Sequence, residues 1–347
     1  MTLAVRYTSA RTLDTASAIG APPGPGEVEL APAYVGICGT DLHIFHGDMD
    51  ARVQTPAVLG HEMSGRVVRV GTGVEGWRAG DAVTVMPLRW DGTCPACRAG
   101  HQHICQHLDF IGIDSPGAMQ QRWTVPASTL IRLPDSLALD RAALVEPTAV
   151  AVHDVGRAKV AEGEKAVVVG GGPVGVLIAL VARAAGAEVR VVEPSAHRRL
   201  LAEELGLTVW DPAADGIGAL AGEWTQDAGA DVAFEVSGAA GGVDTAVDVL
   251  GVRGRLCLVA IHPRPREVNL HRFFWRELTL VGARLYDRGD FERAVTLVAD
   301  GTIPAERLIS KVVPLTQAPA AFEALEGGGD VMKILVDCTD DTEGAAA

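Results

Sequence analysis

The chain has 347 residues, which is enough for two domains of ordinary size. Apolar residues make up 48% of the chain and glycines number 40, a composition typical of an α/β protein with many tight turns and not of a coiled coil or a disordered chain. The formal charge of −14, from 30 basic and 44 acidic residues, repels phosphate backbones and anionic lipid headgroups, so nucleic acid and membranes are not expected as partners.

The N-terminal sequence MTLAVRYTSARTLD lacks the basic and apolar regions of a secretory signal. We therefore expect a cytoplasmic protein whose six cysteines stay reduced, so that clustered cysteines bind metal and do not form disulfides. One uncharged run, residues 166–182, contains four glycines and a proline. These residues make it a strand, a turn and a buried helix and not a membrane span.

The chain up to about residue 145 contains short alternating runs such as GRVVRVG and DAVTVMP, separated by glycine, proline and aspartate. This pattern predicts an antiparallel, barrel-like body. From about residue 150, the sequence KAVVVGGGPVGVLIALVARAAGAEVRVVE predicts a strand, a glycine turn, a helix and a second strand. The segments ADVAFEVSG, GRLCLVAIH and LTLVGA predict further apolar strands, separated by helices such as residues 243–250.

The last part of the chain, from about residue 284, contains two helical stretches, FERAVTLVADG and APAAFEALEGG, and a final strand, VMKILVDC. Apolar strands that alternate with helices indicate a parallel sheet covered on both faces. We therefore expect an α/β protein in which one domain is inserted into another. Residues 1–148 and 285–347 form the β-rich domain, and residues 149–284 form the doubly wound domain.

A glycine turn follows the first strand of the predicted doubly wound domain, where Gly170-Gly171-Gly172-Pro173-Val174-Gly175 fits the pattern G-x-G-x-x-G. The pattern alone is weak, but here a strand precedes it and a helix follows it, as dinucleotide binding requires. Gly170 permits the tight turn, Gly172 lets the backbone approach a pyrophosphate, and Gly175 lets the helix pack close to the strand. The N–H groups at the start of the helix then bind the phosphates.

Glu193 ends the next strand, 18 residues beyond Gly175. Its carboxylate can accept hydrogen bonds from the ribose hydroxyls of adenosine, and its charge repels a 2′-phosphate. Arg198 and Arg199 complicate this assignment, because an arginine there can pair with that phosphate. The sequence favours NAD over NADP.

Four short stretches carry side chains that zinc accepts as ligands. Cys38 lies in GICGTD, His61 and Glu62 lie in GHE, Glu146 lies in VEPTAV, and three cysteines lie in DGTCPACRAGHQHIC. Each has a structural alternative, because buried cysteines are common and a lone histidine is more often a core residue. Their combination with a dinucleotide-binding domain indicates a metal-dependent oxidoreductase.

The stretch GHEMSGRVVRVGTGV, residues 60–74, matches the signature G-H-E-x2-G-x5-G-x2-V. Together with GICGTDLH before it, and EPTAVAVH and VVVGGGPVG after it, this stretch resembles the zinc-dependent medium-chain dehydrogenase/reductase superfamily over essentially the whole chain. The resemblance is to the branch of sorbitol, butanediol and threonine dehydrogenases. It implies a GroES-like catalytic domain and an inserted Rossmann domain.

The resemblance makes Cys38 and His61 ligands of a catalytic zinc ion. It makes Glu62 a direct or exchangeable ligand, and Glu146 either a ligand or a hydrogen-bond partner of the zinc-bound water. Glu146 occupies the place of a third zinc-binding cysteine in classical alcohol dehydrogenases. Asp41 would orient His61, as a metal-bound imidazole usually requires.

Thr40 and His43 follow Cys38 closely, and the resemblance assigns them to a proton relay. An alcohol must lose its hydroxyl proton before its carbon releases hydride, and zinc makes such a hydroxyl acidic. The Thr40 hydroxyl can accept this proton because it both accepts and donates hydrogen bonds. It would pass the proton through the nicotinamide ribose to His43, which titrates near neutral pH. Without a relay, Thr40 would be a turn residue and His43 an exposed polar side chain.

The second cysteine cluster has the spacing C-x2-C-x7-C at Cys94, Cys97 and Cys105. The family it resembles has four cysteines in its structural zinc lobe, and the first of them falls on Asp91 here. Aspartate can bind zinc, so a second, structural zinc with one aspartate and three thiolates is our prediction. Two alternatives remain open: the lobe holds no metal, or a histidine supplies the fourth ligand. The candidate histidines are His101, His103 and His107.

The predicted activity is the interconversion of a secondary alcohol in a polyol, diol or cyclitol and its ketone, with zinc and NAD. We expect the substrate between the two domains. Residues that we expect to line its pocket are Phe45, Trp90, Phe110, Glu146 and those around Tyr286. Threonine oxidation and a sugar dehydrogenase of the glucose type are the enzyme alternatives, although no arginine stands out as an anchor for a carboxylate.

Two further alternatives come from other classes of protein. One is a zinc-free reductase of quinones or enones with the same fold, and the other is a nucleotide-binding protein without turnover. The complete set of Cys38, Thr40, His61 and Glu146 argues against both. Through the resemblance we also expect a homodimer or homotetramer joined by strand edges of the cofactor domain.

Overall fold

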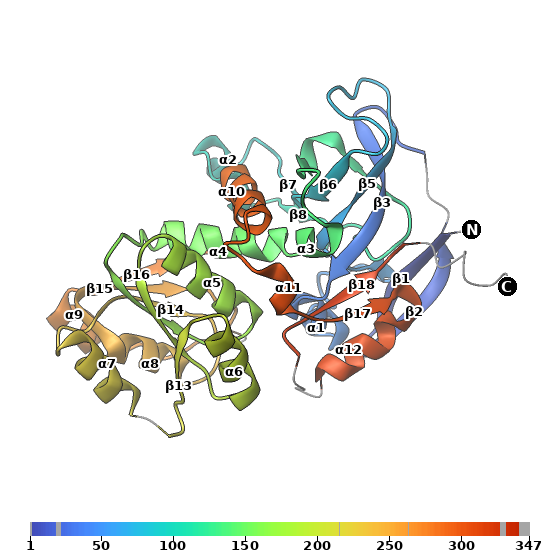
Figure 1. Ribbon diagram of the computed structural model, residues 1–347. Helices are drawn as coiled ribbons and strands as arrows, with labels where there is room; N and C mark the ends of the chain where they lie inside the picture. The colour runs from blue at the N-terminus through green and yellow to red at the C-terminus, as the bar shows by residue number, and fades with distance from the viewer. Residues whose placement is uncertain (1, 19–21, 215, 263, 327–330, 340–347) are drawn as a thin grey trace. The chain divides into compact units, whose positions relative to one another are not determined.

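The computed structural model of the chain describes residues 2–18, 22–214, 216–262, 264–326 and 331–339. The chain divides into two compact units (Figure 1). Unit 1 comprises Met1–Glu146 and Asp287–Ala347, and unit 2 comprises Pro147–Tyr286. The boundaries expected from the sequence differ from these by two residues on each side.

Unit 1 is built mainly from antiparallel strands, as the alternating sequence predicts. Its largest sheet has the order β10-β6-β5-β3-β18-β17, with β9 also paired to β3. The strands of this sheet are β3 (Glu27–Gly36), β5 (Glu62–Val70), β6 (Ala82–Val85), β9 (Trp123–Pro126), β10 (Leu130–Arg132), β17 (Ile309–Pro314) and β18 (Lys333–Asp337). A smaller sheet contains β1 (Thr2–Ser9), β2 (Thr12–Ala18) and β4 (Ala57–Val58), and a hairpin-like pair contains β7 (Leu88–Arg89) and β8 (Asp109–Phe110).

Short helices surround these strands. They are α1 (Gly39–Phe45), α2 (Pro95–Arg98), α3 (Leu139–Ala142), α10 (Arg288–Ala299), α11 (Ala305–Leu308) and α12 (Ala318–Glu326), with 3-10 turns η1 (Gln102–Ile104), η2 (Ala127–Thr129) and η3 (Leu315–Gln317). Helix α4 (Val145–Arg157) begins at the end of unit 1 and continues into unit 2.

The pairing of three strands places the functional region of unit 1. Strand β3 ends at Gly36, which is opposite Glu62 at the start of β5. Strand β18 also runs antiparallel to β3 and begins at Lys333, with Leu335 opposite Gly36. A Cβ atom on Gly36 would lie only 2.2 Å from Oε2 of Glu62, so the register requires glycine there. Residues far apart in sequence therefore meet at one edge of the sheet.

Unit 2 contains a six-stranded sheet with the order β13-β12-β11-β14-β15-β16, in which every pair is parallel. This is the doubly wound order predicted from the sequence. Its elements are β11 (Lys165–Val169), α5 (Pro173–Ala184), β12 (Glu188–Val192), α6 (Ala196–Glu204), β13 (Thr208–Trp210), α7 (Ile217–Thr225), β14 (Ala230–Glu235), α8 (Gly242–Val249), β15 (Leu250–Leu258), α9 (Leu270–Arg276) and β16 (Thr279–Gly282).

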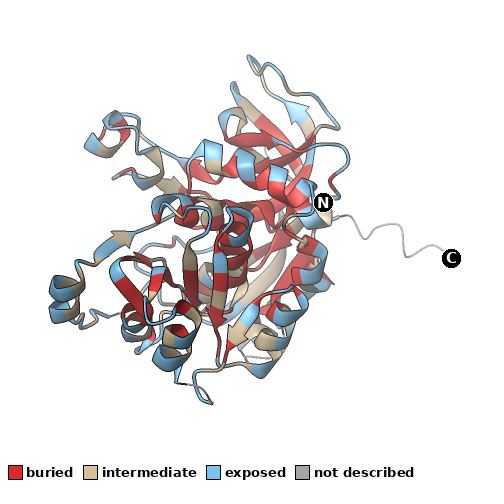
Figure 2. Ribbon diagram, turned by 60° about the vertical axis from the view of Figure 1, so that its left-hand side comes forward, coloured by how far each residue is buried: buried red, intermediate tan, exposed pale blue. Residues whose placement is uncertain are grey.

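The strand order of unit 2 reverses beside β11, because β12 lies on one side of it and β14 on the other. Ligands of open α/β sheets bind outside the carboxyl ends of the strands at such a point. Helix α5 packs on β11 and β12, and α8 packs on β11, β14 and β15. In each unit the buried residues are concentrated in the strands and in the helix faces against them (Figure 2).

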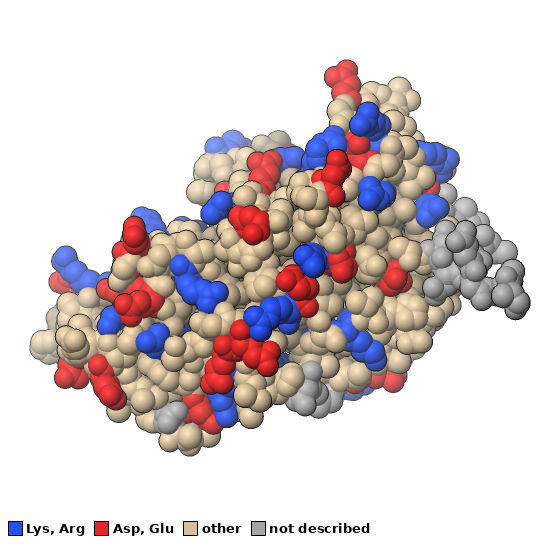
Figure 3. All heavy atoms as spheres, viewed as in Figure 1, with Lys and Arg blue, Asp and Glu red and all other residues tan. Residues whose placement is uncertain are grey.

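Charged side chains of both signs are interspersed over the face of the molecule shown in Figure 3. Within the described part of the chain, no helix combines the length and the apolarity that a membrane crossing requires.

Substitution of Gly175 tests whether the close approach of α5 to β11 needs a residue without a side chain. A Cβ atom there would lie 1.8 Å from the carbonyl oxygen of Gly170, so the backbone would have to shift. We expect Gly175→Ala to lower the free energy of unfolding by about 3 kcal/mol. Gly156→Ala is the matched control, because Gly156 is helical and has no atom within 4 Å of an added Cβ. It should raise stability by about 0.5–1 kcal/mol. Urea denaturation measures both, and equal effects would contradict this account.

Candidate metal centre and cofactor site

Cys38, His61 and Glu62 meet at the edge where β3 and β5 pair. One ligand atom from each lies within 4.8 Å of the others. Cys38 precedes the first turn of α1, and the two other residues enter β5. His61 and Glu62 are only 3% and 1% exposed, so their polar atoms need partners within the protein. The structure thus brings together three of the four residues that the sequence proposes around the catalytic metal.

Asp41 lies behind this cluster and is fully buried. Its Oδ2 accepts a hydrogen bond from the backbone N–H of Cys38 at 2.9 Å, and its Oδ1 is 3.6 Å from Nδ1 of His61. Burial lowers the pKa of His61, but the Asp41 carboxylate and the Cys38 sulfur together raise it by more. The pKa of His61 therefore lies well above its usual value. The pocket therefore favours positive charge at His61.

This arrangement fits zinc. A sulfur, an imidazole nitrogen and a carboxylate oxygen are its usual ligands. Nδ1 of His61 and Oδ1 of Asp41 are buried and make no hydrogen bond. Metal binding through the other ring nitrogen would leave a proton on Nδ1 directed at Asp41, which is the usual support of a metal-bound histidine.

Lys333 is a buried cation that the sequence interpretation missed. Its Nζ donates hydrogen bonds to both carboxylate oxygens of Glu62, at 2.9 and 2.6 Å, and to the carbonyl oxygen of Ile37 at 3.2 Å. Burial lowers the pKa of Lys333, but Glu62, Cys38 and Glu146 raise it, and the net shift is upward. The signal in the sequence was a single lysine in the apolar strand VMKILVDC. A charge at a strand start with apolar neighbours marks a paired ion.

Glu146 lies in the first turn of α4 and is 4% exposed. It is not part of the three-residue cluster within 4.8 Å. Its carboxylate is close enough to Lys333 to raise the pKa of the ammonium group. The structure thus places Glu146 near the cluster, on the side of Lys333.

Thr40 and His43 lie on the single two-turn helix that follows Cys38. They are separated by three positions and so share one side of α1, while Asp41 is buried on another side. His43 is exposed and its Nδ1 is 3.2 Å from Oδ2 of Asp48. Thr40 is half-buried, so this side of the helix leads from the buried end of β3 to solvent.

The aromatic residues expected around the substrate have different surroundings. The ring of Phe110 meets that of His61 edge-on, with centroids 5.2 Å apart. Phe45 is buried against Phe322, and Tyr286 is also buried. Trp90 is 43% exposed. Phe110 is therefore the expected pocket residue that the structure places beside the candidate metal ligands.

Asp91, Cys94, Cys97 and Cys105 form the second cluster, again with one ligand atom from each within 4.8 Å of the others. The sulfurs of Cys94 and Cys105 are 3.8 Å apart, so the cysteines are not joined by a disulfide. The N–H groups of Gln106 and Cys97 lower the pKa of Cys94 to about 7. Three thiols and a carboxylate in this arrangement fit a tetrahedral zinc site.

His107 competes for the carboxylate of Asp91. Nδ1 of His107 is 2.5 Å from Oδ2 of Asp91, and this contact lowers the pKa of Asp91 and raises that of His107. Oδ1 of Asp91 accepts hydrogen bonds from the N–H groups of Thr93 and Cys94. His107 therefore contacts the fourth residue of the cluster, and the four clustered residues are those that the family resemblance implies.

The glycine turn has the geometry that a dinucleotide site requires. Gly170 has a φ of +113°, a conformation that favours glycine. Gly172 is the N-cap of α5, and Pro173 and Val174 are its first two residues. The first turn of the helix thus presents free N–H groups beyond the end of β11.

Glu193 directly follows β12, beside this turn. Its Oε2 accepts a hydrogen bond from the N–H of Gly171 at 2.7 Å, and its Oε1 accepts one from Ser195 at 2.8 Å. Arg199 is engaged by the carboxylate of Asp211 at 2.7 Å. The guanidinium of Arg198 lies toward the turn, 3.8 Å from where a Cβ atom of Gly172 would be.

Residues 24–135 match the family described as the alcohol dehydrogenase GroES-like domain, and residues 173–300 match the family described as zinc-binding dehydrogenase. The chain is 48% identical to the 2-dehydro-3-deoxy-L-galactonate 5-dehydrogenase of Pseudoalteromonas atlantica, over 96% of this chain and 98% of that protein. The chain belongs to the zinc-binding dehydrogenases of the medium-chain superfamily.

Two other members of this family are close in sequence or structure. The L-galactonate-5-dehydrogenase of Escherichia coli is 31% identical, over 87% of this chain and 88% of that protein. The crystal structure of a putative zinc-binding dehydrogenase from Sinorhizobium meliloti, bound to NADP, has a TM-score of 0.91 and 31% identity, covering 97% of this chain and 99% of that one.

Membership of the polyol dehydrogenase-like branch confirms the resemblance, the GroES-like and Rossmann fold, and the class of reaction. The protein is an alcohol dehydrogenase that interconverts a secondary alcohol and its ketone, with zinc and a nicotinamide cofactor. The candidate ligands of the catalytic metal are Cys38, His61 and Glu62, which the geometry of the cluster brings together.

The buried pair of Lys333 and Glu62 provides a test of the metal centre. Lys333→Met would leave the Glu62 carboxylate buried without its cation. We expect the free energy of unfolding to fall by about 3–5 kcal/mol, and the double variant Lys333→Met/Glu62→Gln to recover most of this loss. The control is Arg253→Met, which removes an exposed ion pair with Glu277 and should cost no more than about 1 kcal/mol. Chemical denaturation measures all three, and a Lys333 variant as stable as the control would refute the role of this pair.

Proposed function

We propose that the protein oxidises a secondary hydroxyl of an open-chain sugar acid, with NAD as the hydride acceptor. The support for the substrate is that relatives covering nearly the whole chain are named for the 5-dehydrogenation of a 2-dehydro-3-deoxy-galactonate and of L-galactonate. Such substrates are hydroxylated chains, within the polyol class that the sequence predicts. The single observation that supports the chemistry is the convergence of Cys38, His61 and Glu62 behind one sheet edge.

Cys38 and His61 are the ligands that hold the catalytic zinc in this proposal. Bound zinc supplies Lewis-acid chemistry that makes an alcohol hydroxyl acidic. Asp41 holds the ring of His61 and the backbone of Cys38, so that both ligands are positioned before the metal binds. Glu62 shares its carboxylate with Lys333, which suits a ligand that exchanges, and Glu146 supplies further negative charge at the same place.

Thr40 and His43 move the hydroxyl proton outward. The Thr40 hydroxyl accepts a proton from the substrate and donates its own onward, since it has one O–H and two lone pairs. His43 is exposed in the last turn of α1, with Asp48 beside it, and can exchange the proton with solvent. The side of α1 that carries both residues supports this route.

NAD is the proposed cofactor because Glu193 places a carboxylate, anchored by the N–H groups of Gly171 and Ser195, next to the turn that binds the phosphates. A 2′-phosphate on the adenosine ribose would meet this charge. Arg199 is already paired with Asp211, which leaves Arg198 as the arginine directed at the turn.

Asp91, Cys94, Cys97 and Cys105 hold a second, structural zinc in this proposal. All of the cysteines of the chain are free, including the close pair Cys94 and Cys105, which supports a reducing, cytoplasmic location. The metal would cross-link the segment between β7 and β8, which has few apolar side chains to pack.

A homodimer or homotetramer is the proposed assembly. Strand β16 ends the six-stranded sheet and leaves one edge unpaired among the described strands. The neighbouring helix α9 exposes Leu270, Phe274 and Trp275, and Leu280 on β16 is also half exposed. An unpaired edge next to large exposed apolar side chains is typical of a surface that a second copy covers.

A panel of substrates with both cofactors tests the proposed reaction. We expect NAD reduction to be fastest with L-galactonate or its 2-dehydro-3-deoxy derivative, slower with sorbitol and 2,3-butanediol, and slowest with L-threonine. The ratio of kcat/KM for NAD to that for NADP should exceed 10 and should fall about tenfold in Glu193→Ala, which removes the charge that repels the 2′-phosphate. Arg198→Ala serves as the comparison and should not lower this ratio. A preference for threonine, or for NADP, would contradict the proposal.

Counting the zinc ions tests the second site. We expect two zinc ions per chain in the purified protein and one in Asp91→Ala, since three thiolates hold zinc less tightly than a complete tetrahedral set. Asp109→Asn is the control, because Asp109 is a nearby acidic residue that pairs with Arg89 outside the cluster. Mass spectrometry of the dialysed proteins measures the number of zinc ions per chain in each variant. One ion in the wild-type protein, or two in Asp91→Ala, would remove Asp91 from the ligand set.

A further inference from the structure

Glu235 is a fully buried carboxylate at the end of β14, and the catalytic scheme does not use it. Its Oε1 accepts hydrogen bonds from the N–H groups of Ser237 and Gly238, both at 3.0 Å, and from the Ser237 hydroxyl at 2.5 Å. Three donors from the same turn thus converge on one oxygen. The carboxylate therefore fixes the turn that follows β14.

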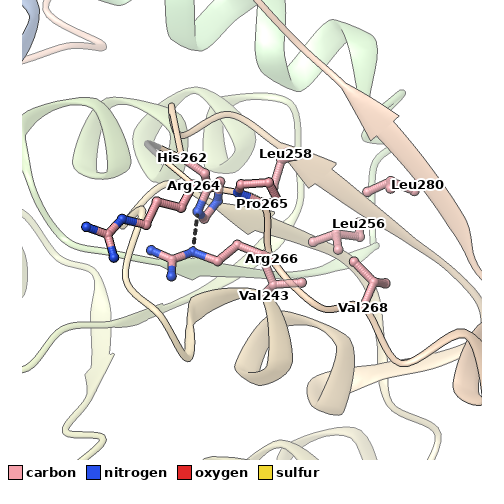
Figure 4. A pocket seen from close by; sticks show the side chains of 9 residues that line it. All are labelled: Val243, Leu256, Leu258, His262, Arg264, Pro265, Arg266, Val268 and Leu280. Atoms are coloured by element: carbon pink, nitrogen blue, oxygen red, sulfur yellow. Dashed lines mark hydrogen bonds between the residues drawn. The ribbon is translucent and has the colours of Figure 1, made fainter.

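The other oxygen of Glu235 reaches a second loop. Oε2 is 2.9 Å from Nε2 of His262, in the loop that follows β15. Nε of Arg266 donates to Nδ1 of His262 at 3.3 Å, as the dashed line in Figure 4 shows. A guanidinium donates hydrogen bonds and cannot accept them, so Nδ1 of His262 is the acceptor. The N–H of His262 is then at Nε2, and it donates a hydrogen bond to Oε2 of Glu235. The three side chains form one directed chain of hydrogen bonds.

The turn held by Glu235 packs against the glycine turn of the cofactor site. A Cβ atom on Gly170 would lie 2.9 Å from the backbone nitrogen of Ser237, and the N–H of Val236 donates to the carbonyl of Val169 at 3.0 Å. Arg266 also donates to the carbonyl oxygen of Gly238 at 3.4 Å. The network therefore joins the carboxyl ends of β11, β14 and β15, the strands at which the fold binds its dinucleotide.

Backbone and apolar contacts hold the two ends of the loop that carries His262 and Arg266: the N–H groups of Val259 and Ala260 donate to the carbonyl oxygen of Glu235, and Val268 packs against the apolar core of unit 2. The loop lies over a cavity of about 430 Å³. The apolar side chains that line this cavity are Val243, Leu256, Leu258, Val268 and Leu280 (Figure 4). Between its ends the loop has His262, Pro265 and Arg266 lining this cavity, so fewer apolar contacts hold them than a close-packed core would supply. The positions of His262 and Arg266 therefore rely on their polar contacts with Glu235 and Gly238.

We infer that Glu235, His262 and Arg266 are positioning residues that hold the nicotinamide half of the cofactor crevice in its binding shape. Glu193 at the end of β12 marks the adenosine side of the sheet. The ends of β14 and β15, on the other side of β11, then face the nicotinamide half. A loop fixed before the cofactor arrives costs no ordering when it binds, so the network raises affinity without touching the reacting atoms.

The test measures the Kd of NADH for the purified full-length protein from the change in NADH fluorescence on binding. His262→Phe should raise the Kd by about tenfold or more, because it leaves a buried carboxylate oxygen without its donor. His262→Gln, which keeps an N–H donor, should recover most of the affinity. Arg264→Ala is the matched control. Arg264 lies in the same loop, two residues from Arg266, and among the described residues its side chain is not one of those hydrogen-bonded to Glu235 or His262, so the Kd of this variant should equal that of the wild type.

A steady-state comparison separates positioning from a general loss of structure. In His262→Phe the KM for the cofactor should rise much more than kcat falls, and zinc content should stay unchanged. If His262→Phe does not fold, Arg266→Met takes its place. Arg266→Met removes the hydrogen bonds from Arg266 to His262 and Gly238 and leaves the Glu235–His262 contact in place. The Kd of this variant for NADH should rise about threefold to fivefold. A folded His262→Phe or Arg266→Met protein that binds NADH as tightly as the wild type overturns the inference. Binding that weakens equally in Arg264→Ala also overturns it.

Discussion

Negative charge buried at the edge of a β-sheet must be balanced by positive charge, and the metal centre of this protein depends on that balance. Asp41 and Glu62 are buried carboxylates, and the partly buried thiol of Cys38 lies beside them. An isolated carboxylate in such a place is costly unless a cation or several donors accompany it. Lys333 offsets Glu62 directly, and the Asp41 carboxylate and the Cys38 sulfur raise the pKa of His61 above its usual value. A divalent cation held by Cys38 and His61, as proposed, would balance the remaining negative charge.

The same constraint explains why the strands pair as they do. Glu62, the end of β3 and Lys333 meet because β5 and β18 both run antiparallel to β3. Gly36 permits the close approach, since any side chain there would collide with the Glu62 carboxylate. The sheet thus brings a cation from residue 333 to an anion at residue 62, and the ion pair in turn joins the C-terminal strand to the core of unit 1.

In unit 2 a different kind of interaction prevails. The cofactor site is made mostly of backbone groups, with the turn after β11 shaped by glycine and the neighbouring turns shaped by two buried carboxylates. Glu193 accepts hydrogen bonds at the end of β12, and Glu235 does so at the end of β14. Each carboxylate orders a turn at the carboxyl edge of the sheet. The two anions lie on opposite sides of β11, where the strand order reverses.

The sequence by itself determined the features that depend on local patterns. Apolar periodicity predicted the doubly wound sheet, and the run from Gly170 to Gly175 marked the cofactor turn, because strand, turn and helix are consecutive in the chain. The spacing of the three cysteines marked the second cluster for the same reason, and the family resemblance added Asp91 to it. Only the tertiary structure decided which distant side chains meet. Lys333 beside Glu62, and His262 between Glu235 and Arg266, depend on strand register and loop position. No local pattern encodes such pairs, since the partners are brought together by packing and by the need to pair buried charge.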